Sequence, residues 1–403
     1  MGTNSRFGFK GATFDSRLVE PGMLYVALKG EKADGNDYIP QAKERGAAKV
    51  IGGPDALAET QALAREYRRA LRPRTAVVAV TGSAGKTTTK ELLKAFLSTA
   101  GRTHATSGNF NNHLGLPMTI LNCPEDADFL VVEMGTNHPG EIAALCEIAE
   151  PDAGLITNIG TAHIEFFKTR DGIAREKGTL FARLGRGAAG APPPRGVAPF
   201  AVASKTNDKL GVLRGLSAVP LVEADPAQEW MAEALKGVLP GAHNVSNACL
   251  AFALAERYGV TREMAAGALK GFGLPGSRWR IAVKDGVKFI DDTYNASPDS
   301  MTAALDALKS TPCGGRRIAV LGDMFELGEQ SDALHAKVFG HAAAIGLDAV
   351  YAVGERSSKC AATAAFPSVD AFREAMPSLL KAGDTVLLKA SHAMSLGSVA
   401  PQR

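Results

Sequence analysis

The sequence predicts an α/β protein of three domains, with a parallel sheet in the central one. The chain has 403 residues, whereas single hydrophobic cores stop growing at about 250–300 residues. Short apolar runs rich in β-branched residues alternate with helical patterns along most of the chain, as in a doubly wound sheet. A glycine-rich segment, Gly82–Lys90 (GSAGKTTTK), lies between one such run and a helical pattern. That position is where parallel sheets carry a P-loop.

The first domain is expected over residues 1–72. Within it, Asp15–Gly53 combines short strands, Pro-Gly and Asp-Gly turns and a helical pattern at Tyr38–Arg45. A charged helical stretch, Asp55–Leu71, then meets Pro73. Because proline cannot continue a helix, we place the first boundary there.

The central domain is expected over residues 73–285. Its strand candidates are Thr75–Val80, Phe129–Met134 and Gly154–Ile159. The segment Leu184–Phe200 is rich in Gly, Ala, Pro and Arg and has no apolar period, which predicts a loop or linker.

The third domain is expected over residues 286–403. Strand candidates again alternate with helical patterns there, at Lys288–Asp292, Arg317–Leu321, Ala349–Gly354 and Asp384–Lys389. This alternation predicts a second parallel sheet.

The bulk composition excludes several classes of protein. Apolar residues make up 45% and charged residues 22%, as in globular proteins. The formal net charge of +3 gives no strong field for nucleic acid or an anionic membrane. Five cysteines without C-x-x-C pairing favour free thiols over disulfides or a zinc site. The sequence shows neither a long apolar run nor a secretory signal, so we expect a cytoplasmic protein without membrane insertion.

The glycine-rich segment has the residues that a phosphate loop needs. Small residues let backbone N–H groups and a helix N-terminus face phosphate oxygens. Lys86 would supply a positive charge, and the Thr87 hydroxyl would ligate Mg²⁺. The residues expected to contact ATP are Gly82, Ser83, Gly85, Lys86, Thr87 and Thr88. The alternative is a glycine-rich turn with a chance lysine, and the order strand, loop, helix argues against it.

Two later strand ends carry residue types that bind metals. Glu133 closes one apolar run, and His163 follows another. Parallel strands end at the same edge of a sheet, so both side chains would lie near Lys86 and hold Mg²⁺ beside the phosphates. Each residue alone is more often structural.

Two other clusters have a functional and a structural interpretation. Asn109 and Asn112 (GNFNN) offer amide groups in a loop, or simply form an Asn-rich turn. Asp292 and Asn295 (IDDTYNASPDSM) follow a strand of the third domain. Such clusters suggest recognition of a cationic group or a sugar nucleotide, although some members would be helix caps.

Taken in order, these motifs resemble the Mur ligase family, and within it the MurF type. The matching segments are DSRLVEPGMLYVALKG (15–30), VTGSAGKTTTKE (80–91), SGNFNNHLGLP (107–117), VVEMGTNHPGEI (131–142), ITNIGTAHIEFF (156–167), GAHNVSNA (241–248), LPGSRW (274–279), IDDTYNASPDSM (290–301) and VLGDMFELG (320–328).

The resemblance implies a three-domain Mur ligase architecture. The first domain would bind the UDP-sugar substrate, the central P-loop domain would bind ATP, and a dinucleotide-fold-like C-terminal domain would help to bind the incoming amine. The implied reaction joins D-alanyl-D-alanine to UDP-N-acetylmuramoyl-tripeptide through an acyl phosphate, with ATP as co-substrate and Mg²⁺ as the metal. A monomer is expected.

The resemblance also implies roles for particular residues. Ser16 and Arg17 would hold the UDP-muramoyl substrate, with Asn109 and Asn112 as further substrate contacts. Glu133 and His163 would bind Mg²⁺, and His163 would take part in catalysis.

Further roles concern the nucleotide. Asn244 and Asn247 would lie near the adenine, and Arg278 would reach a phosphate from the hinge. Asp292 would bind the ribose, and Asn295 the nucleotide or the dipeptide.

Lys177 (GIAREKGTLF) matches a lysine that is carbamylated in related ligases. As a carbamate it would serve catalysis as a ligand or orienting partner for Mg²⁺. The alternative is an ordinary solvated lysine, since Glu176 suggests a charged helix face.

The sequence departs from the family pattern in three places. We expect the first domain to be shortened at its N-terminus, the expected strand after Phe181 is not evident, and Lys389-Ala390-Ser391-His392 stands where the family has KGSR. Two other functions therefore stay open. One is a different P-loop NTPase or phosphotransferase. The other is a degenerate, non-catalytic homologue that binds UDP-sugar or ATP.

Overall fold

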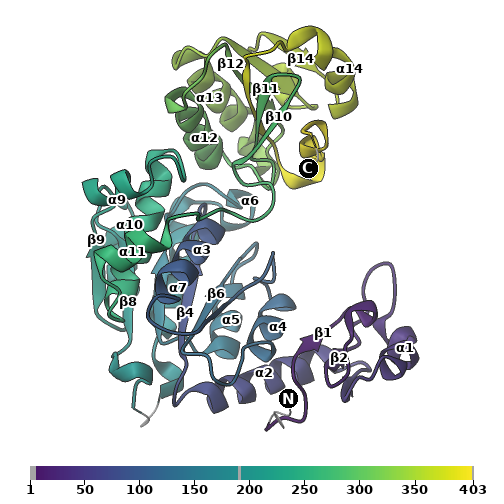
Figure 1. Cartoon of the computed structure of the whole chain (residues 1–403), viewed down its shortest axis with the longest axis vertical. Helices are drawn as coiled ribbons and strands as arrows, with labels where there is room; N and C mark the ends of the chain where they lie inside the picture. Colours follow the sequence, from purple (N-terminus) through teal and green to yellow (C-terminus); the bar gives the residue numbers. More distant parts are fainter. Residues whose placement is uncertain (1–5, 189–191, 402–403) are drawn as a thin grey trace.

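The computed structural model describes residues 6–188 and 192–401, and its elements form three α/β units (Figure 1). In Figure 1 the first unit lies beside the lower part of the central one, and the third unit lies above the central one. The α/β class predicted from the sequence is confirmed.

The first unit is a small parallel sheet with short helices. Its elements are β1 (Ala12–Thr13), β2 (Leu24–Val26), β3 (Lys49–Ile51) and α1 (Ile39–Glu44), with the sheet order β1-β2-β3. A 3-10 turn, η1 (Ser16–Leu18), follows β1, and the Asp15 side chain caps it by accepting the Arg17 backbone N–H at 3.0 Å.

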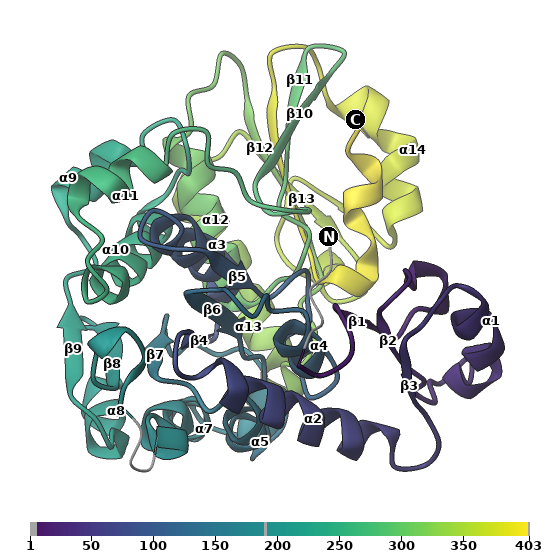
Figure 2. The same ribbon diagram turned by 60° about the horizontal axis from the view of Figure 1, so that its bottom comes forward.

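A long helix, α2 (Ala56–Leu71), joins the first unit to the central one and runs along the central unit (Figure 2). Its apolar residues pack in the same hydrophobic core as one face of the central sheet. The buried Arg68 donates to Asp152 Oδ2 at 2.7 Å and to the Ala149 carbonyl at 2.9 Å. The helix expected to close the first domain is therefore anchored to the second.

The central sheet has six parallel strands in the order β5-β6-β4-β7-β8-β9. They are β5 (Thr103–Ala105), β6 (Phe129–Glu133), β4 (Ala76–Thr81), β7 (Ala153–Ile156), β8 (Phe200–Ser204) and β9 (Leu221–Ala224). Successive residues of β4 enter two different cores, with Val77 and Ala79 on one side and Val78 and Val80 on the other. Both faces are buried, which is why the sequence reads there as an unbroken apolar run.

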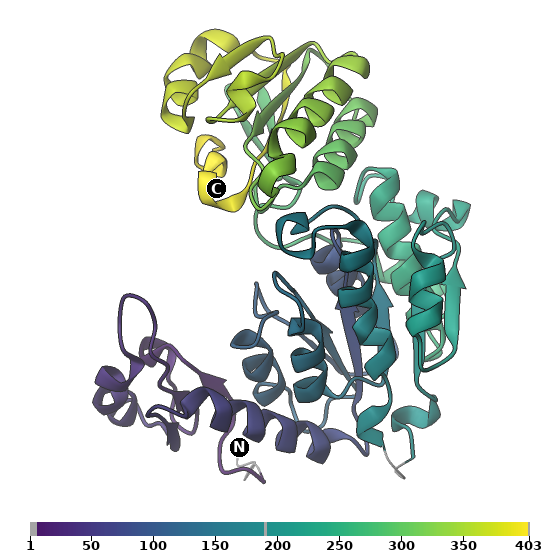
Figure 3. The ribbon, with the colours of Figure 1, turned by 180° about the vertical axis from the view of Figure 1, so that it is seen from behind.

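Helices cover both faces of this sheet (Figure 3). Besides α2, one face carries α4 (Gly115–Leu121), α5 (Glu141–Ala149), α7 (Arg170–Arg183) and α8 (Leu210–Leu216). The other carries α3 (Lys86–Leu97), α9 (Glu229–Ala234), α10 (Ala242–Glu256) and α11 (Arg262–Ala268). The short α6 (Ile164–Phe167) follows β7.

The third unit has a six-stranded sheet in the order β10-β11-β15-β12-β13-β14. Its strands are β10 (Arg280–Lys284), β11 (Val287–Asp291), β15 (Thr385–Lys389), β12 (Arg317–Gly322), β13 (Ala349–Val353) and β14 (Ala364–Phe366), and its helices are α12 (Pro298–Ser310), α13 (Ser331–Ala344) and α14 (Val369–Leu379). Only β10 pairs antiparallel in this sheet.

The segment 184–200 was expected to be a loop, and its described residues up to 199 contain no strand. Phe200, however, is the first residue of β8. The strand expected after Phe181 is present as β8, at the end of that segment, so the sheet continues. In addition, β10 forms a hairpin whose turn is at 285–286, where the third domain was expected to begin.

None of the helices in residues 6–188 and 192–401 combines the length and the apolar character needed to cross a membrane. All five cysteines are free, and Cys123, Cys146 and Cys249 are buried.

Candidate active site

A cleft of ≈ 990 Å³ lies at the carboxyl ends of the central strands, between the central and third units. Most of the residues singled out in the sequence line it. They are Ser83, Gly85, Lys86, Thr87, Thr88, Asn112, Glu133, His163, Asn244, Asn247, Arg278, Asp292 and Asn295. Residues from positions 83 to 295 are thus brought to one place.

The phosphate loop between β4 and α3 depends on two glycines with positive φ. Gly82 has φ 150° and Gly85 has φ 77°. A Cβ on Gly82 would lie 1.8 Å from Thr157 Oγ1, and one on Gly85 would lie 2.7 Å from the Asn247 amide. Neither position has room for a side chain.

Lys86 is the first residue of α3, and its ammonium group folds back over the loop. Its Nζ donates to the Gly82 carbonyl at 2.9 Å. Burial lowers the pKa of Lys86, while Glu133 opposes that shift and Arg278 adds to it. A bound anion would favour the charged lysine in this place.

Glu133 is buried at the end of β6 and organises the loop. Its Oε2 accepts the Thr87 hydroxyl at 2.8 Å, and its Oε1 accepts the Asn111 amide at 2.8 Å. Arg278 Nη2 donates to Thr87 Oγ1 at 3.1 Å. One hydroxyl group therefore contacts a carboxylate of the central unit and a guanidinium from the hinge.

His163 precedes α6 and faces the third unit. Its Nδ1 lies 2.5 Å from Glu326 Oε2. Both residues have left-handed backbones, with φ 60° and φ 61°. The His163 ring holds the pKa of the Glu326 carboxyl below its usual range, although burial opposes this.

Lys177, on α7, is completely buried, which excludes the solvated helix lysine. Its Nζ has no hydrogen-bond partner among the described residues. Burial drives the pKa of Lys177 well below its usual value, and Lys86 adds to the shift. Glu176 is not on a charged face either, because its carboxylate accepts the backbone N–H groups of Gly140 and Ile142 at 2.8 and 2.9 Å.

The third-unit side of the cleft is built around Arg278 and Asp292. The Arg278 guanidinium lies 3.4 Å from the Tyr294 ring centroid. Asp292 Oδ2 pairs with Lys389 Nζ at 2.6 Å, and Lys389 also donates to the Asn295 carbonyl at 3.1 Å. The Asn295 side chain accepts the Ala296 N–H at 2.8 Å.

Several predicted residues have local structural roles or lie elsewhere. Asn112 lies at the start of α4, where its Oδ1 accepts the Gly115 N–H at 2.9 Å. Ser16 and Arg17 belong to the first unit, where they contact Gln41 and Asp15. Gly82, Asn109 and Lys177 do not line the cleft directly.

Further residues that were not predicted as site residues also line the cleft, among them Asn158, His138, Asp299 and Lys389. A rule that looks for polar residues at strand ends would have found two of them, because Lys389 ends β15 and Asn158 lies two residues beyond β7.

The oxygen atoms of Thr87 and Glu133 suit Mg²⁺, which prefers one or two protein oxygens together with substrate phosphates. In the described part of the chain, no three His, Cys, Asp or Glu side chains gather as a group that could hold a metal ion. A site completed by phosphate oxygens and water fits these residues best.

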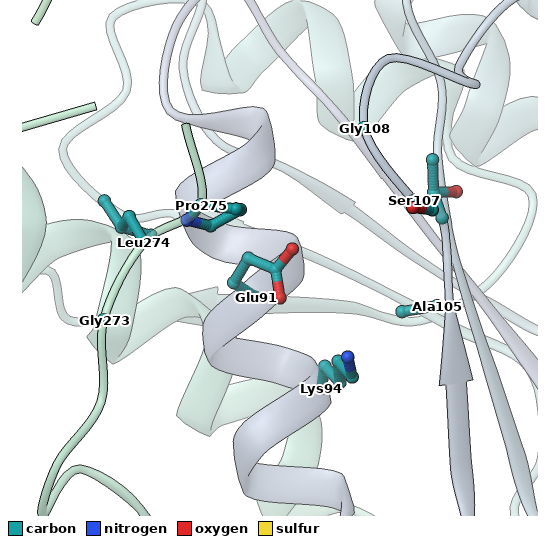
Figure 4. Close-up of a pocket in the computed structure, with 9 residues that line it drawn as sticks. Glu91, Lys94, Ala105, Ser107, Gly108, Gly273, Leu274 and Pro275 are labelled. Carbon is teal, nitrogen blue, oxygen red and sulfur yellow. The ribbon is translucent and has the colours of Figure 1, made fainter. Parts of the chain in front are cut away.

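A second hollow of ≈ 520 Å³ lies beside α3 (Figure 4). Glu91 and Lys94 project into it from α3, between the hinge residues 273–275 and the segment 105–108. None of the predicted site residues line it.

Three models of protein families match the chain. They are described as Mur ligase family, catalytic domain (residues 9–95), Mur ligase middle domain (80–191) and Mur ligase, glutamate ligase domain (277–392). Together they match parts of all three units.

Curated relatives and solved structures agree with this. The UDP-N-acetylmuramoyl-tripeptide--D-alanyl-D-alanine ligase of Escherichia coli is 35% identical over 86% of this chain and 81% of its own length. The ligase of the same name from Bacillus subtilis is 34% identical over 96% and 92%. The MurF structure from Acinetobacter baumannii has a TM-score of 0.81 at 28% identity, covering 97% and 92%. The Thermotoga maritima MurF ligase in complex with ADP has a TM-score of 0.80 at 27% identity, covering 98% and 97%.

Proposed function

The chain belongs to the Mur ligase family, and from this membership we propose that it joins D-alanyl-D-alanine to UDP-N-acetylmuramoyl-tripeptide in peptidoglycan precursor synthesis. ATP is the co-substrate, and the enzyme is an ADP-forming ligase that makes a C–N bond. The observation that carries the proposal is the single cleft in which Lys86, Thr87 and Glu133 face Arg278 and Asp292.

The first chemical step is phosphoryl transfer to the tripeptide. ATP lies with its phosphates over the loop 82–88, where backbone N–H groups and the start of α3 face them. A carboxylate oxygen of the tripeptide bonds to the γ-phosphorus while the bond to the β,γ-bridging oxygen breaks, and ADP leaves. Lys86, whose Nζ donates to the Gly82 carbonyl, and Arg278, which donates to the Thr87 hydroxyl, would offset the charge that develops.

The second step forms the peptide bond. The neutral amine of D-alanyl-D-alanine attacks the acyl carbon, the C–N bond forms, the C–O bond to phosphate breaks, and the proton that the amine loses passes to the departing phosphate. Holding both reactants in one cleft makes this attack effectively unimolecular. His163 lines the cleft beside Glu326 of the third unit. We propose that it contacts the reacting groups from that side of the cleft.

Mg²⁺ is proposed to be held by Thr87 and Glu133, with His163 and a modified Lys177 as further contributors to metal binding. When bound, the ion would neutralise phosphate charge as a Lewis acid. The nucleotide would extend toward Asn244 and Asn247 with its adenine, and toward Asp292 with its ribose. Asn295 would contact the nucleotide or the dipeptide.

Lys177 is proposed to act as a carbamate. Its buried Nζ without a partner and its lowered pKa both favour the neutral amine, which is the form that attacks CO₂. The N–C bond forms while one C–O π bond of CO₂ breaks, and the amine proton passes to solvent, so that a buried neutral amine becomes an anion. An anion beside Lys86 is favourable where a second cation is not.

The first unit would hold the UDP portion of the substrate through Ser16 and Arg17, with Asn109 and Asn112 toward the peptide. Arg17 is exposed, and its guanidinium pairs with Asp15 of the same turn; because an exposed ion pair contributes little free energy, a diphosphate would replace Asp15 at low cost. Because ATP and UDP-sugars are cytoplasmic metabolites, the enzyme would act in the cytoplasm. It would act as a monomer.

The proposal is tested by measuring phosphate release with both acceptor and dipeptide, with each one alone, and with neither. We expect ADP formation only when both are present, and the Lys86→Ala variant serves as the inactive control. Rapid ATP turnover without either substrate would favour a general P-loop NTPase. Binding of ATP or UDP-sugar without any turnover would favour a non-catalytic homologue.

A further inference from the structure

The segment 157–161, which follows β7, is fastened to the phosphate loop. Asn158 accepts the Ser83 N–H through its carbonyl at 3.0 Å and the Ala84 N–H through its side-chain oxygen at 3.1 Å. The Gly160 N–H donates to Ser83 Oγ at 2.9 Å. A shift of this segment therefore shifts the loop that holds the phosphates.

The same segment contacts the third unit through Asp299, in the first turn of α12. Asp299 Oδ2 accepts the Thr161 N–H at 2.8 Å and the Thr161 hydroxyl at 3.0 Å. Both donors come from the central unit, so one carboxylate oxygen bridges two domains.

Gly160 allows this close approach. A Cβ at Gly160 would lie 2.2 Å from Asp299 Oδ2 and 3.3 Å from the Ser83 Cβ. Gly160 does not have a positive φ, so its backbone would accept an alanine. The space, and not the backbone conformation, is what requires glycine here.

An acidic residue in the first turn of a helix also interacts well with the helix dipole. Asp299 would serve that role equally well if its side chain faced solvent, and Ser297 already caps α12 by accepting the Ser300 N–H. The stability of the helix therefore does not require the contacts between Asp299 and Thr161.

We propose that Asp299 is a positioning residue that couples the third domain to the phosphate loop through Gly160 and Thr161. The contact holds the third domain where Arg278 reaches Thr87 and Glu326 reaches His163. Its role rests on the proposed ligase function, because it concerns the arrangement in which phosphoryl transfer occurs.

The test is a double-mutant cycle with Asp299→Ala, Gly160→Ala and the double variant, measured by dipeptide-dependent phosphate release. We expect Asp299→Ala to lower kcat about three- to tenfold, since the carboxylate is at the exposed rim of the cleft and is screened. The dissociation constant for ADP should change less, because the loop's bonds to Asn158 and Gly160 stay intact. Gly160→Ala should lower kcat at least as much.

The double variant decides the question. Removal of the Asp299 carboxylate relieves the 2.2 Å contact and leaves the new methyl group only the 3.3 Å contact with Ser83 Cβ, so the double variant should have nearly the turnover of Asp299→Ala alone. If Gly160→Ala lowers kcat by the same factor in both backgrounds, the methyl group does not act through Asp299 and the proposal is wrong. Asp299→Ala with the wild-type kcat would also overturn it.

A matched control and a second readout keep this test separate from the ligase assignment. Asp306 is another acidic residue of α12, but it pairs with His341 inside the third unit at 2.7 Å, so Asp306→Ala should leave kcat unchanged. Small-angle scattering of the full chain with ADP and Mg²⁺ should show a larger radius of gyration for Asp299→Ala than for Asp306→Ala. If the wild type lacks ligase turnover, the proposed function fails, while equal radii for the two variants would refute the coupling by itself.

Discussion

The guanidinium of Arg278 lies 3.4 Å from the centroid of the Tyr294 ring, and its Nη2 donates to the Thr87 hydroxyl at 3.1 Å. The ring forms a platform that holds a hinge cation over the phosphate loop. Tyr294 itself is fixed at the end of β11, where its backbone N–H donates to the Ser277 carbonyl at 3.1 Å. In the part of the chain that the structure describes, Arg278 has no acidic partner, so its orientation depends on this ring and on the Thr87 hydroxyl.

Tyr294→Phe should keep nearly full activity, because the aromatic face remains, whereas Tyr294→Ala should lower kcat. A cation–π contact contributes about 0.5–2 kcal/mol, which corresponds to about 2- to 30-fold in rate. Steady-state kinetics at saturating ATP measure this. Equal losses in the two variants would show that the hydroxyl group, and not the ring face, matters.

Lys86→Ala and Asp292→Ala should fail in different ways. A lysine–phosphate charge pair contributes on the order of 4 kcal/mol before desolvation, so Lys86→Ala should lower kcat by about a thousandfold. Asp292→Ala should mainly raise KM for ATP, about 10- to 100-fold, because a hydrogen bond to a charged group is lost in ground and transition states alike. Similar kcat losses with unchanged KM in both variants would contradict these roles.

Glu133→Gln should raise the Mg²⁺ concentration needed for half-maximal activity by about tenfold or more. The amide keeps the size of the side chain and can still accept the Thr87 hydroxyl, but it lacks the negative charge. Titration of activity with Mg²⁺ at fixed ATP measures the effect. Glu147→Gln, on the outer face of α5 where it pairs with Arg183, is the control, and an unchanged Mg²⁺ dependence of Glu133→Gln would remove Glu133 from the metal site.

Lys177→Ala should remove most activity, and added acetate or formate should restore part of it by entering the vacated space as an anion. The wild type should also lose activity in CO₂-depleted buffer and regain it with bicarbonate, because the carbamate forms reversibly. Lys168→Ala, at an exposed lysine of the preceding turn, controls for loss of surface charge. Wild-type turnover in Lys177→Ala would refute the carbamate.

The central sheet could be predicted from the sequence because its strands are buried on both faces. Thr75–Val80 and Phe129–Met134 read as short, mostly apolar runs rich in β-branched residues, and they contain β4 and β6. β10 could not be predicted in the same way, since Ile281 and Val283 alternate with polar or small residues at an exposed edge. Its pairing partner is also set by a tight turn rather than by an apolar run.

The site was predictable where its chemistry is local in the sequence. The loop 82–88 carries its own signature, because glycine, lysine and threonine must follow a strand in a fixed order. Contacts between domains have no such signature. Glu326 and Asp299 meet His163 and Thr161 only through the packing of two folded units, and nothing in the spacing of these residues indicates that packing.

The central claim is that one cleft phosphorylates the tripeptide carboxylate and then joins it to D-alanyl-D-alanine. Mass spectrometry of a reaction with UDP-N-acetylmuramoyl-tripeptide, D-alanyl-D-alanine and ATP tests it most directly. The account predicts a UDP-muramoyl-pentapeptide whose mass equals that of the tripeptide nucleotide plus the dipeptide minus water, formed in step with ADP and phosphate. ADP formation at the same rate with no pentapeptide product, or no product at all from folded protein that binds ATP, would contradict it.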